Sequence, residues 1–446
     1  MVDYSRRDFI RMTGYALGGV LLTGCGGGGS SPNGYRFYRL KATGDTAGDG
    51  ARAMTIADFG GSVHISDGGV ITFDAYDAGK RHGLFQLEVD FDRYKPLIVR
   101  QETSLISGEV LNDLRVVRDF AAHDVDGLGN IAAIVQPKAS GKNGHYFGGL
   151  YYKRRHADVV PILIYGDELD DGDTIAGGHF GDLALCENNG ILVVANHLPK
   201  TPGSGTGRGL IHLPDPAGGL TTVNRLLGVE DFINRTDHLI QGFGLVDVGL
   251  NGVFAVNASA APSDLLTAGS VDTQHCLLTA HLSAPNDHML LAAPSAIATS
   301  LHTGGISYGP RVGADGTVFT KVGGFEGNNA EALVKDGEVI RRTDMAGLYG
   351  EYAASFTSGA TAADGTYYYT QYVENANGTV SIDLLMYDGS GHHLLLSVGD
   401  RIANVDEPIA NIIFSTTTNH VDGNNRIVML CQFADETTGL VVGVPV

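Results

Sequence analysis

A short turn recurs seven times along this chain and constrains its fold more than any other feature. The first clear copy, Ser66-Asp67-Gly68-Gly69, is followed directly by the apolar run 70–73. A backbone position with positive φ selects glycine first and tolerates asparagine better than most other residues. A turn of that geometry followed by an apolar strand predicts a β-hairpin. The aligned copies place the fourth turn position at Gly69, Gly129, Gly190, Gly252, Gly316, Gly365 and Asn425.

The copies are separated by 60, 61, 62, 64, 49 and 60 residues. Apolar segments of about 5 to 8 residues with short links fill each interval, which is typical of an antiparallel meander. In the first copy we expect strands at 56–66, 70–76, 84–89 and 95–100. An aromatic residue marks each first strand, at Phe59, Phe120, Phe180, Phe243, Tyr308, Phe356 and Phe414.

Four-stranded meanders repeated at this period predict an all-β chain that forms a seven-bladed β-propeller. After Asn425 the chain has room for only two more strands, at 426–433 and 440–446. Segment 38–45 has the Gly-Asp ending of the other fourth strands, so we expect this N-terminal strand to complete the last blade. Closing the ring in this way removes exposed sheet edges. β-Solenoid rungs are too short for this period, and two stacked β-sandwiches would not give seven even copies.

The first 24 residues have the organisation of an export signal. Residues 5–11, Ser-Arg-Arg-Asp-Phe-Ile-Arg, resemble a twin-arginine signal in which Arg6 and Arg7 are the diagnostic pair. The mildly apolar segment 12–22 is too short to span a membrane. It ends in Leu-Thr-Gly-Cys, which resembles a bacterial lipobox, and the resemblance implies lipid on Cys25 and cleavage just before it. A buried N-terminal helix is the competing interpretation.

The chain therefore divides into a signal peptide at 1–24, a tether at 25–35 and a propeller at 36–446. The tether is rich in glycine and serine and is expected to be flexible. Gly26, rather than Asp, follows the cysteine, and resemblance to Gram-negative lipoproteins then implies delivery to the outer membrane. We expect export by the twin-arginine route and a lipid anchor in the outer membrane, on its periplasmic or surface face.

Charge and composition narrow the expected partners. The formal net charge of −20 repels phosphate backbones, so we do not expect a nucleic-acid partner. A hydrophobic content of 43% is that of a globular chain, and the charge favours a monomer. A small molecule, a glycan or a protein is the expected class of ligand. Cys186, Cys276 and Cys431 lie in apolar runs and are expected to be buried free thiols.

The repeats resemble exported tandem-repeat proteins with an Asn-x-x-Gly-x-x-Ala-Phe consensus and a Gly-Asp before each unit. Residues 66–73 read Ser-x-x-Gly-x-x-Thr-Phe, residues 126–133 read Asp-x-x-Gly-x-x-Ala-Ala, and residues 249–256 read Gly-x-x-Gly-x-x-Ala-Val. The resemblance covers nearly all of residues 36–446. It implies the fold and the export, and it supplies no catalytic residues.

The candidate ligand site comprises Asp58, Asp119 and His179. Each precedes the aromatic residue of a first strand, so on successive blades the three would lie near the mouth of the central channel. Convergent polar groups are what a ligand site requires. Two hypotheses follow: a non-enzymatic binding or scaffolding module, or a metal-dependent lyase or hydrolase with its site at the channel mouth. No P-loop or His-Glu-x-x-His motif occurs.

Two further sets of residues are candidates for metal binding. Asp167, Asp171 and Asp173 lie in an acidic loop after a fourth strand, and an oxygen-rich loop of this kind can hold Ca²⁺. The spacing departs from the Asp-x-Asp-x-Asp-Gly loop, and a solvated turn is the alternative. The imidazoles of His64, His123 and His420 near the ends of first strands could bind copper or zinc, or simply line the channel.

The predicted address can be tested by cell fractionation. Replacing Arg6 and Arg7 by lysine is expected to block export, so that the protein stays in the cytoplasm. Cys25→Ser is expected to move the exported protein from the membrane pellet to the soluble fraction, because the lipid is lost. Continued export of the double-lysine variant, or membrane sedimentation of the serine variant, would contradict the respective assignment.

Overall fold

The computed structural model describes residues 34–446 except fourteen short gaps. The gaps are 93–94, 112–114, 138–147, 170, 199–206, 219–222, 235–237, 263–273, 291–307, 326–329, 347–352, 358, 375–379 and 415–419. The predicted signal peptide, with Arg6, Arg7 and Cys25, lies outside the described residues. In the part of the chain that is described, no helix is long and apolar enough to cross a membrane.

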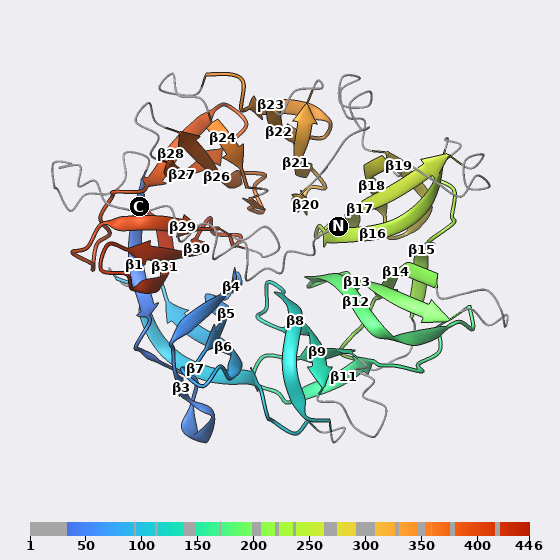
Figure 1. The fold of residues 1–446 in the computed structure, drawn as a ribbon, viewed down its shortest axis with the longest axis horizontal. Coiled ribbons are helices and arrows are strands. Elements are labelled where there is room, and N and C mark those ends of the chain that lie inside the picture. Colours follow the sequence, from blue (N-terminus) through green and yellow to red (C-terminus); the bar gives the residue numbers. More distant parts are fainter. Residues whose placement is uncertain are drawn as a thin grey trace.

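Seven antiparallel sheets stand around a central axis (Figure 1), which confirms the predicted seven-bladed β-propeller. Blade 1 contains β4 (Asp58–Ile65), β5 (Val70–Tyr76), β6 (His82–Asp90) and β7 (Leu97–Ile106). Blade 2 contains β8 (Val117–Val125), β9 (Ile131–Pro137), β10 (Gly149–Lys153) and β11 (Val159–Leu163). Blade 3 contains β12 (Thr174–Cys186), β13 (Gly190–Leu198), β14 (Gly207–Leu213) and β15 (Asn224–Gly228). Blade 4 contains β16 (His238–Val248), β17 (Val253–Pro262), β18 (Gln274–His281) and β19 (Ala284–Leu290). Blade 5 contains β20 (Tyr308–Val312), β21 (Val318–Phe325), β22 (Ala330–Lys335) and β23 (Glu338–Arg342). Blade 6 is β24 (Ala353–Phe356), β25 (Ala360–Thr361), β26 (Tyr367–Glu374), β27 (Val380–Tyr387) and β28 (His392–Ser397), and blade 7 contains β29 (Ile409–Ile413), β30 (Ile427–Phe433) and β31 (Thr438–Pro445).

The N-terminal strand β1 (Tyr35–Ala42) completes blade 7, as predicted. It pairs antiparallel with β31 from Tyr35 opposite Pro445 to Ala42 opposite Gly439, and the sheet order is β1-β31-β30-β29. Figure 1 shows this blue strand beside the red C-terminal strands. A small hairpin, β2 (Thr46–Ala47) and β3 (Met54–Thr55), with the short 3₁₀ helix η1 (Gly50–Arg52) between its strands, leads from β1 to blade 1. One sheet thus joins both ends of the propeller and leaves no open blade in the ring.

The aligned glycine or asparagine has the predicted positive φ in every blade. This φ lies between 58°, at Asn425, and 88°, at Gly316. In six blades the next residue pairs back to the first turn residue, as Val70 does with Ser66. Blade 3 differs because Gly190 itself pairs with Cys186. The sequence alignment is therefore one residue out of register in blade 3, since a left-handed glycine marks the hairpin there one position later.

Apolar side chains fill the spaces between neighbouring blades. Ile71 and Phe73 on one face of β5 pack with Val428 and Leu430 of blade 7, and each is fully or almost fully buried. Complete burial of one such side chain contributes roughly 1.5–3 kcal/mol. The tyrosines at 367–369 are also fully buried, in β26. The three cysteines Cys186, Cys276 and Cys431 are buried and free, as predicted.

Aspartates bridge the innermost strands of blades 2 to 5. An innermost strand has no neighbouring strand on its channel side, so N–H groups on that edge need other acceptors. Three consecutive junctions use a side-chain Oδ2 for this purpose. The Oδ2 atoms of Asp124, Asp182 and Asp247 accept from the backbone N–H groups of Leu185 (2.8 Å), Val246 (3.2 Å) and Val312 (2.8 Å). The blades are therefore joined by hydrogen bonds as well as by apolar packing.

Two of these carboxyl groups are deeply buried and titrate far from their usual range. Burial raises the pKa of Asp124 to about 7 and that of Asp247 to about 6, although two backbone N–H groups bond to each and partly oppose the shift. His64 lies 3.2 Å from Asp124, and burial lowers the pKa of its imidazole to about 3. Asp247 thus offers the simpler test, since no histidine is paired with it among the described ion pairs.

We expect Asp247→Asn to change how stability depends on pH. A carboxyl whose pKa is raised by folding stabilises the protein below its unfolded pKa, and this contribution is lost as pH rises through the folded pKa. The free energy of unfolding of the wild type, relative to the variant, should fall by on the order of 2–3 kcal/mol between about pH 4 and pH 6. Urea denaturation at several pH values measures it. The exposed Asp406→Asn is the control, and a pH-independent difference for the Asp247 variant would contradict the expectation.

Candidate functional site

The channel has two distinct ends. The first strands begin at one end, here called the mouth, and run to the repeated hairpins at the other. Asp58 lies opposite Tyr76, and Asp119 lies opposite Gln136, so the two carboxylates hold equivalent positions in blades 1 and 2, as the sequence alignment indicates. His179 lies in β12 directly before Phe180, at the corresponding place in blade 3. The side chain of His179 is outside the described residues.

A histidine that the sequence analysis did not select connects the two blades at the mouth. His82, the first residue of β6, contacts the Oδ1 of Asp119 through Nδ1 (2.5 Å) and the Oδ2 of Asp74 through Nε2 (2.8 Å). The three residues come from β6, β8 and β5. The result is a carboxylate–imidazole–carboxylate chain that runs from the channel mouth into the interior.

Packing holds this chain in one orientation. The His82 ring stacks between Tyr76 (centroids 4.2 Å apart) and Phe120 (3.7 Å). Its side chain is only 5% exposed, whereas that of Asp119 is 41% exposed. Asp74 is buried and accepts the N–H of Ser62 at 3.0 Å. The Asp119 carboxylate is therefore a solvent-accessible group fixed by a buried support.

The electrostatics of the chain favour a charged imidazole. Burial alone would lower the pKa of His82, but its hydrogen bonds to Asp119 and Asp74 outweigh this effect, and the pKa is raised. Burial would raise the pKa of Asp74, yet its bond to His82 and the nearby His123 lower it. At the surface, partial desolvation and the charge of Asp74 raise the pKa of Asp58. This arrangement can orient a ligand through a carboxylate and can hold a proton on His82.

A second polar layer lies deeper in the channel. The rings of His64 and His123 are 4.8 Å apart, so the structure brings together two of the three histidines considered for copper or zinc. His420 contacts the carbonyl oxygen of Val428 through Nδ1 (2.7 Å). Over the described part of the chain, no group of three or more His, Cys, Asp or Glu side chains is placed to hold a metal ion.

The acidic loop after β11 has partners for each of its candidate calcium ligands. Asp167 accepts the N–H of Ile164 at 2.7 Å. Asp171 pairs with Arg225 at 3.0 Å, and Asp173 pairs with His197 at 2.8 Å. The Ca²⁺ assignment for Asp167, Asp171 and Asp173 therefore stays a prediction, on a loop whose carboxylates contact an arginine, a histidine and a backbone amide.

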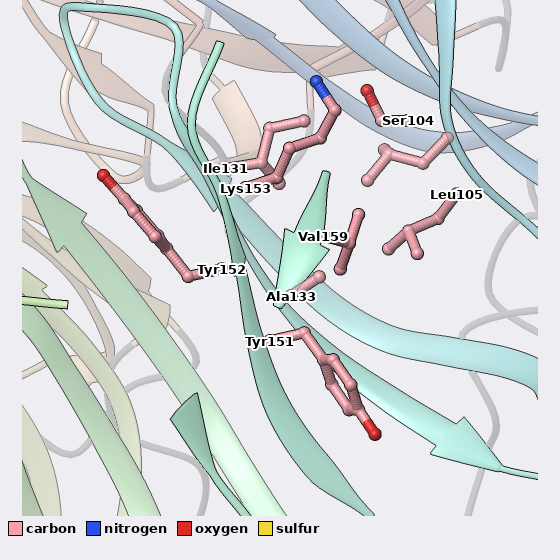
Figure 2. Close-up of a pocket in the computed structure, with 9 residues that line it drawn as sticks. Ser104, Leu105, Ile131, Ala133, Tyr151, Tyr152, Lys153 and Val159 are labelled. Atoms are coloured by element: carbon pink, nitrogen blue, oxygen red, sulfur yellow. The ribbon is translucent and has the colours of Figure 1, made fainter. Parts of the chain in front are cut away.

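Two further cavities lie in the described part of the propeller, one at the hairpin end of the channel and one between blades 1 and 2. At the hairpin end of the channel, a cavity of about 130 Å³ is lined by all seven blades, with Asp67, Asp126, Glu187 and Asp422 on its wall. Between blades 1 and 2 a void of about 10 Å³ lies beside Lys153 (Figure 2). The Lys153 Nζ donates to Glu102 at 2.6 Å, so this void is a packing gap at the limit of one water molecule.

Comparison with known proteins assigns this chain to no family. No protein-family model and no curated protein matches the sequence. Among solved structures, a Trypanosoma rangeli sialidase in complex with sialic acid is 12% identical, with 93% of this chain and 59% of that chain covered and a TM-score of 0.38. A Penicillium chrysogenum α-L-arabinanase is 10% identical, with 78% and 98% covered and a TM-score of 0.37. A PL25 ulvan lyase is 10% identical, with 89% and 83% covered and a TM-score of 0.28.

The chain spans 59% of the length of the sialidase. Identities and TM-scores this low carry no argument about activity. The sheet order itself defines the protein as a seven-bladed β-propeller.

We expect Asp119→Asn to lower the pKa of His82. The carboxylate bonds to Nδ1 and favours the imidazolium, and an amide lacks that charge. NMR titration of the His82 ring, in wild type and variant, measures the change. Asp77→Asn, which removes a partly exposed carboxylate paired with Arg81 in the link before His82, is the control. An unchanged His82 titration in the Asp119 variant would show that this contact is absent in solution.

Proposed function

We propose that this chain is an exported, lipid-anchored β-propeller that binds or scaffolds a ligand at the mouth of its channel. The observation that carries the binding role is the Asp119 carboxylate, exposed on one side and held on the other by the buried His82 and Asp74. Asp58 lies at the equivalent place on the neighbouring blade. Two accessible carboxylates on adjacent rigid strands form a polar group of the kind that fixes a ligand's orientation.

Preorganisation explains why this arrangement suits binding. A side chain that is already ordered loses little conformational entropy when a ligand docks. Stacking between Tyr76 and Phe120 orders His82, and His82 in turn orders Asp119. Carboxylate oxygens accept hydrogen bonds from hydroxyl, amine and amide groups. A small molecule, a glycan or a segment of a protein supplies such donors.

The cellular location is the second part of the proposal, and the sequence alone supports it. Arg6 and Arg7 resemble a twin-arginine pair, Cys25 ends a lipobox-like segment, and Gly26 favours the outer membrane. The tether at 25–35 could reach on the order of 35 Å when extended. A propeller on such a tether can present its mouth to ligands near the membrane without lying against the lipid.

An enzyme is the second candidate, and the Asp74–His82–Asp119 chain is the observation that favours it. An imidazole oriented by a buried carboxylate can give or take a proton at the group it faces. A metal-dependent lyase or hydrolase would place its reaction at the same mouth. The two candidates differ in whether a bound ligand is converted and whether the protein purified from the periplasm contains a stoichiometric metal.

The test uses the Cys25→Ser protein, which is expected to be soluble, and a panel of neutral, amino and uronic oligosaccharides together with short peptides. At least one probe is expected to shift the His82 ring resonances in a saturable way. The Asp58→Asn/Asp119→Asn variant should then bind that probe at least about tenfold more weakly, a loss of roughly 1.4 kcal/mol.

The matched control is Asp406→Asn, which removes an exposed carboxylate from another part of the propeller. Binding that the double variant retains at wild-type strength would refute the proposed site. Release of product from a bound probe, together with a stoichiometric metal in elemental analysis, would favour the enzyme.

A further inference from the structure

The His82–Asp119 contact belongs to a position that repeats around the ring. His82 lies opposite Tyr76, which is ten residues after the first hairpin residue of blade 1. Asp119 lies opposite the corresponding residue of blade 2, Gln136. We call such a pair, a third-strand residue and the first-strand residue of the next blade, a junction pair. Leu84, two residues after His82, packs with blade 2, so this face of β6 is turned toward the next blade.

The junction between blades 5 and 6 has the same construction. Glu331 lies opposite Gly323, and Ser355 lies opposite Tyr372, which are again ten residues after the first hairpin residue of each blade. Ser355 donates its hydroxyl to the Oε2 of Glu331 at 2.7 Å. The other carboxylate oxygen of Glu331 pairs with Lys321 at 2.8 Å. Here too the polar third-strand residue is bonded to a side chain of the next blade.

Between blades 3 and 4 the same position lacks its second side chain. Arg208 lies opposite Asn196, and the next blade has Gly242 opposite Ser259. β14 contacts β16, and Leu210, two residues after Arg208, packs with blade 4. Arg208 is therefore turned toward blade 4, where glycine stands in place of the aspartate or serine found at the other two junctions.

The guanidinium of Arg208 is left without compensation among the described residues. The side chain is half-buried, and its buried Nε has no hydrogen-bond partner among the described residues. Burial lowers its pKa, and no carboxylate in the described part of the chain opposes the shift. Its terminal nitrogen lies 2.6 Å from where a Cβ on Gly181 of β12 would be, so the guanidinium reaches the first strand of blade 3. An unpaired, partly desolvated cation is costly in a chain of net charge −20 that has many carboxylates available.

We propose that Arg208 and the space at Gly242 form an anion subsite, which takes a carboxylate, sulfate or phosphate group of the ligand. The ligand's oxyanion would stand where the Asp119 carboxylate stands at the junction of blades 1 and 2. A planar guanidinium matches such groups with two parallel N–H donors. The subsite lies at the same end of its blade as His82 does, so the inference rests on the proposed mouth site and adds the charge of its ligand.

Replacing Gly242 by aspartate should block the subsite. A Cβ at Gly242 would meet only the Ser259 hydroxyl, at 3.1 Å, within 4 Å, and the backbone there is outside the left-handed region. Gly242→Asp would place a carboxylate at the position equivalent to Asp119. We expect this variant to lose anion binding and to unfold at a temperature several degrees higher, because it supplies the missing partner. Gly242→Asn, of the same size and without the charge, is its matched control.

The experiment follows the side-chain Nε–H resonance of Arg208 by ¹⁵N NMR, identified by its absence from Arg208→Lys. The probes are sodium sulfate, inorganic phosphate and sodium glucuronate, with sodium chloride at equal ionic strength and glucose as the neutral match for glucuronate. We expect a saturable shift with at least one oxyanion and none with chloride or glucose. Comparison of the three oxyanions tells which group the subsite takes. Isothermal titration calorimetry with the same salts measures affinity without the Arg208 resonance. By this measurement Arg208→Gln and Gly242→Asp should each weaken binding at least tenfold, whereas Arg52→Gln, at an arginine paired with Glu109, should not.

The result that overturns the subsite is an absent Arg208 shift with all three oxyanions, or oxyanion affinity retained in both Arg208→Gln and Gly242→Asp. The Gly242 variant keeps the test decisive if Arg208→Gln fails to fold. An oxyanion response at Arg208, together with no response of His82 to any member of the oligosaccharide and peptide panel, would support the subsite and refute the proposed mouth site. A response of His82 to neutral probes, with none at Arg208 to any oxyanion, would overturn the subsite alone.

Discussion

The unpaired channel edge of each innermost strand is the constraint on which the rest of this structure depends. Apolar packing brings the blades together, but a strand with no neighbour on one side leaves buried N–H groups that cost free energy unless they find an acceptor. In blades 2 to 4 the acceptors are Asp124, Asp182 and Asp247. Each accepts from the next blade, so satisfying the edge also sets the position of adjacent blades. A polar channel with buried titratable groups follows from this arrangement.

The same need for acceptors and donors between blades produces the polar groups at the mouth. At two junctions, His82 with Asp119 and Glu331 with Ser355, a third-strand side chain bonds to the next blade. These contacts hold the ring together, and the carboxylate of Asp119 remains accessible while it does so. The same contact can therefore join two blades and leave a carboxylate accessible to solvent. Where the residue opposite is Gly242, blades 3 and 4 still pack through apolar contacts, and the Arg208 Nε has no partner among the described residues.

The sequence alone predicts part of the candidate site, for identifiable reasons. Asp58 and Asp119 could be aligned because each precedes an aromatic residue at a constant distance from a hairpin glycine. His82 and Asp74 were missed because they lie on the second and third strands, where no local signal tells which face meets the next blade. Arg208 has no signal at all in a single sequence. Arg208 stands out only because the next blade has a glycine, Gly242, where the other two junctions have an aspartate or a serine. Gly242 lies 34 positions further along the chain.

The sequence by itself determined the number of blades, the hairpins and the closure of the ring by the N-terminal strand. These features depend on local backbone geometry and on a repeat length, both of which can be read along one dimension. Only the tertiary structure decided the pairing of His82 with Asp119, the one-residue offset in blade 3 and the uncompensated Arg208. Those depend on strand register and on the contact between neighbouring blades, where side chains far apart in the sequence meet. The repeat length fixes the number of such contacts but does not determine which atoms touch.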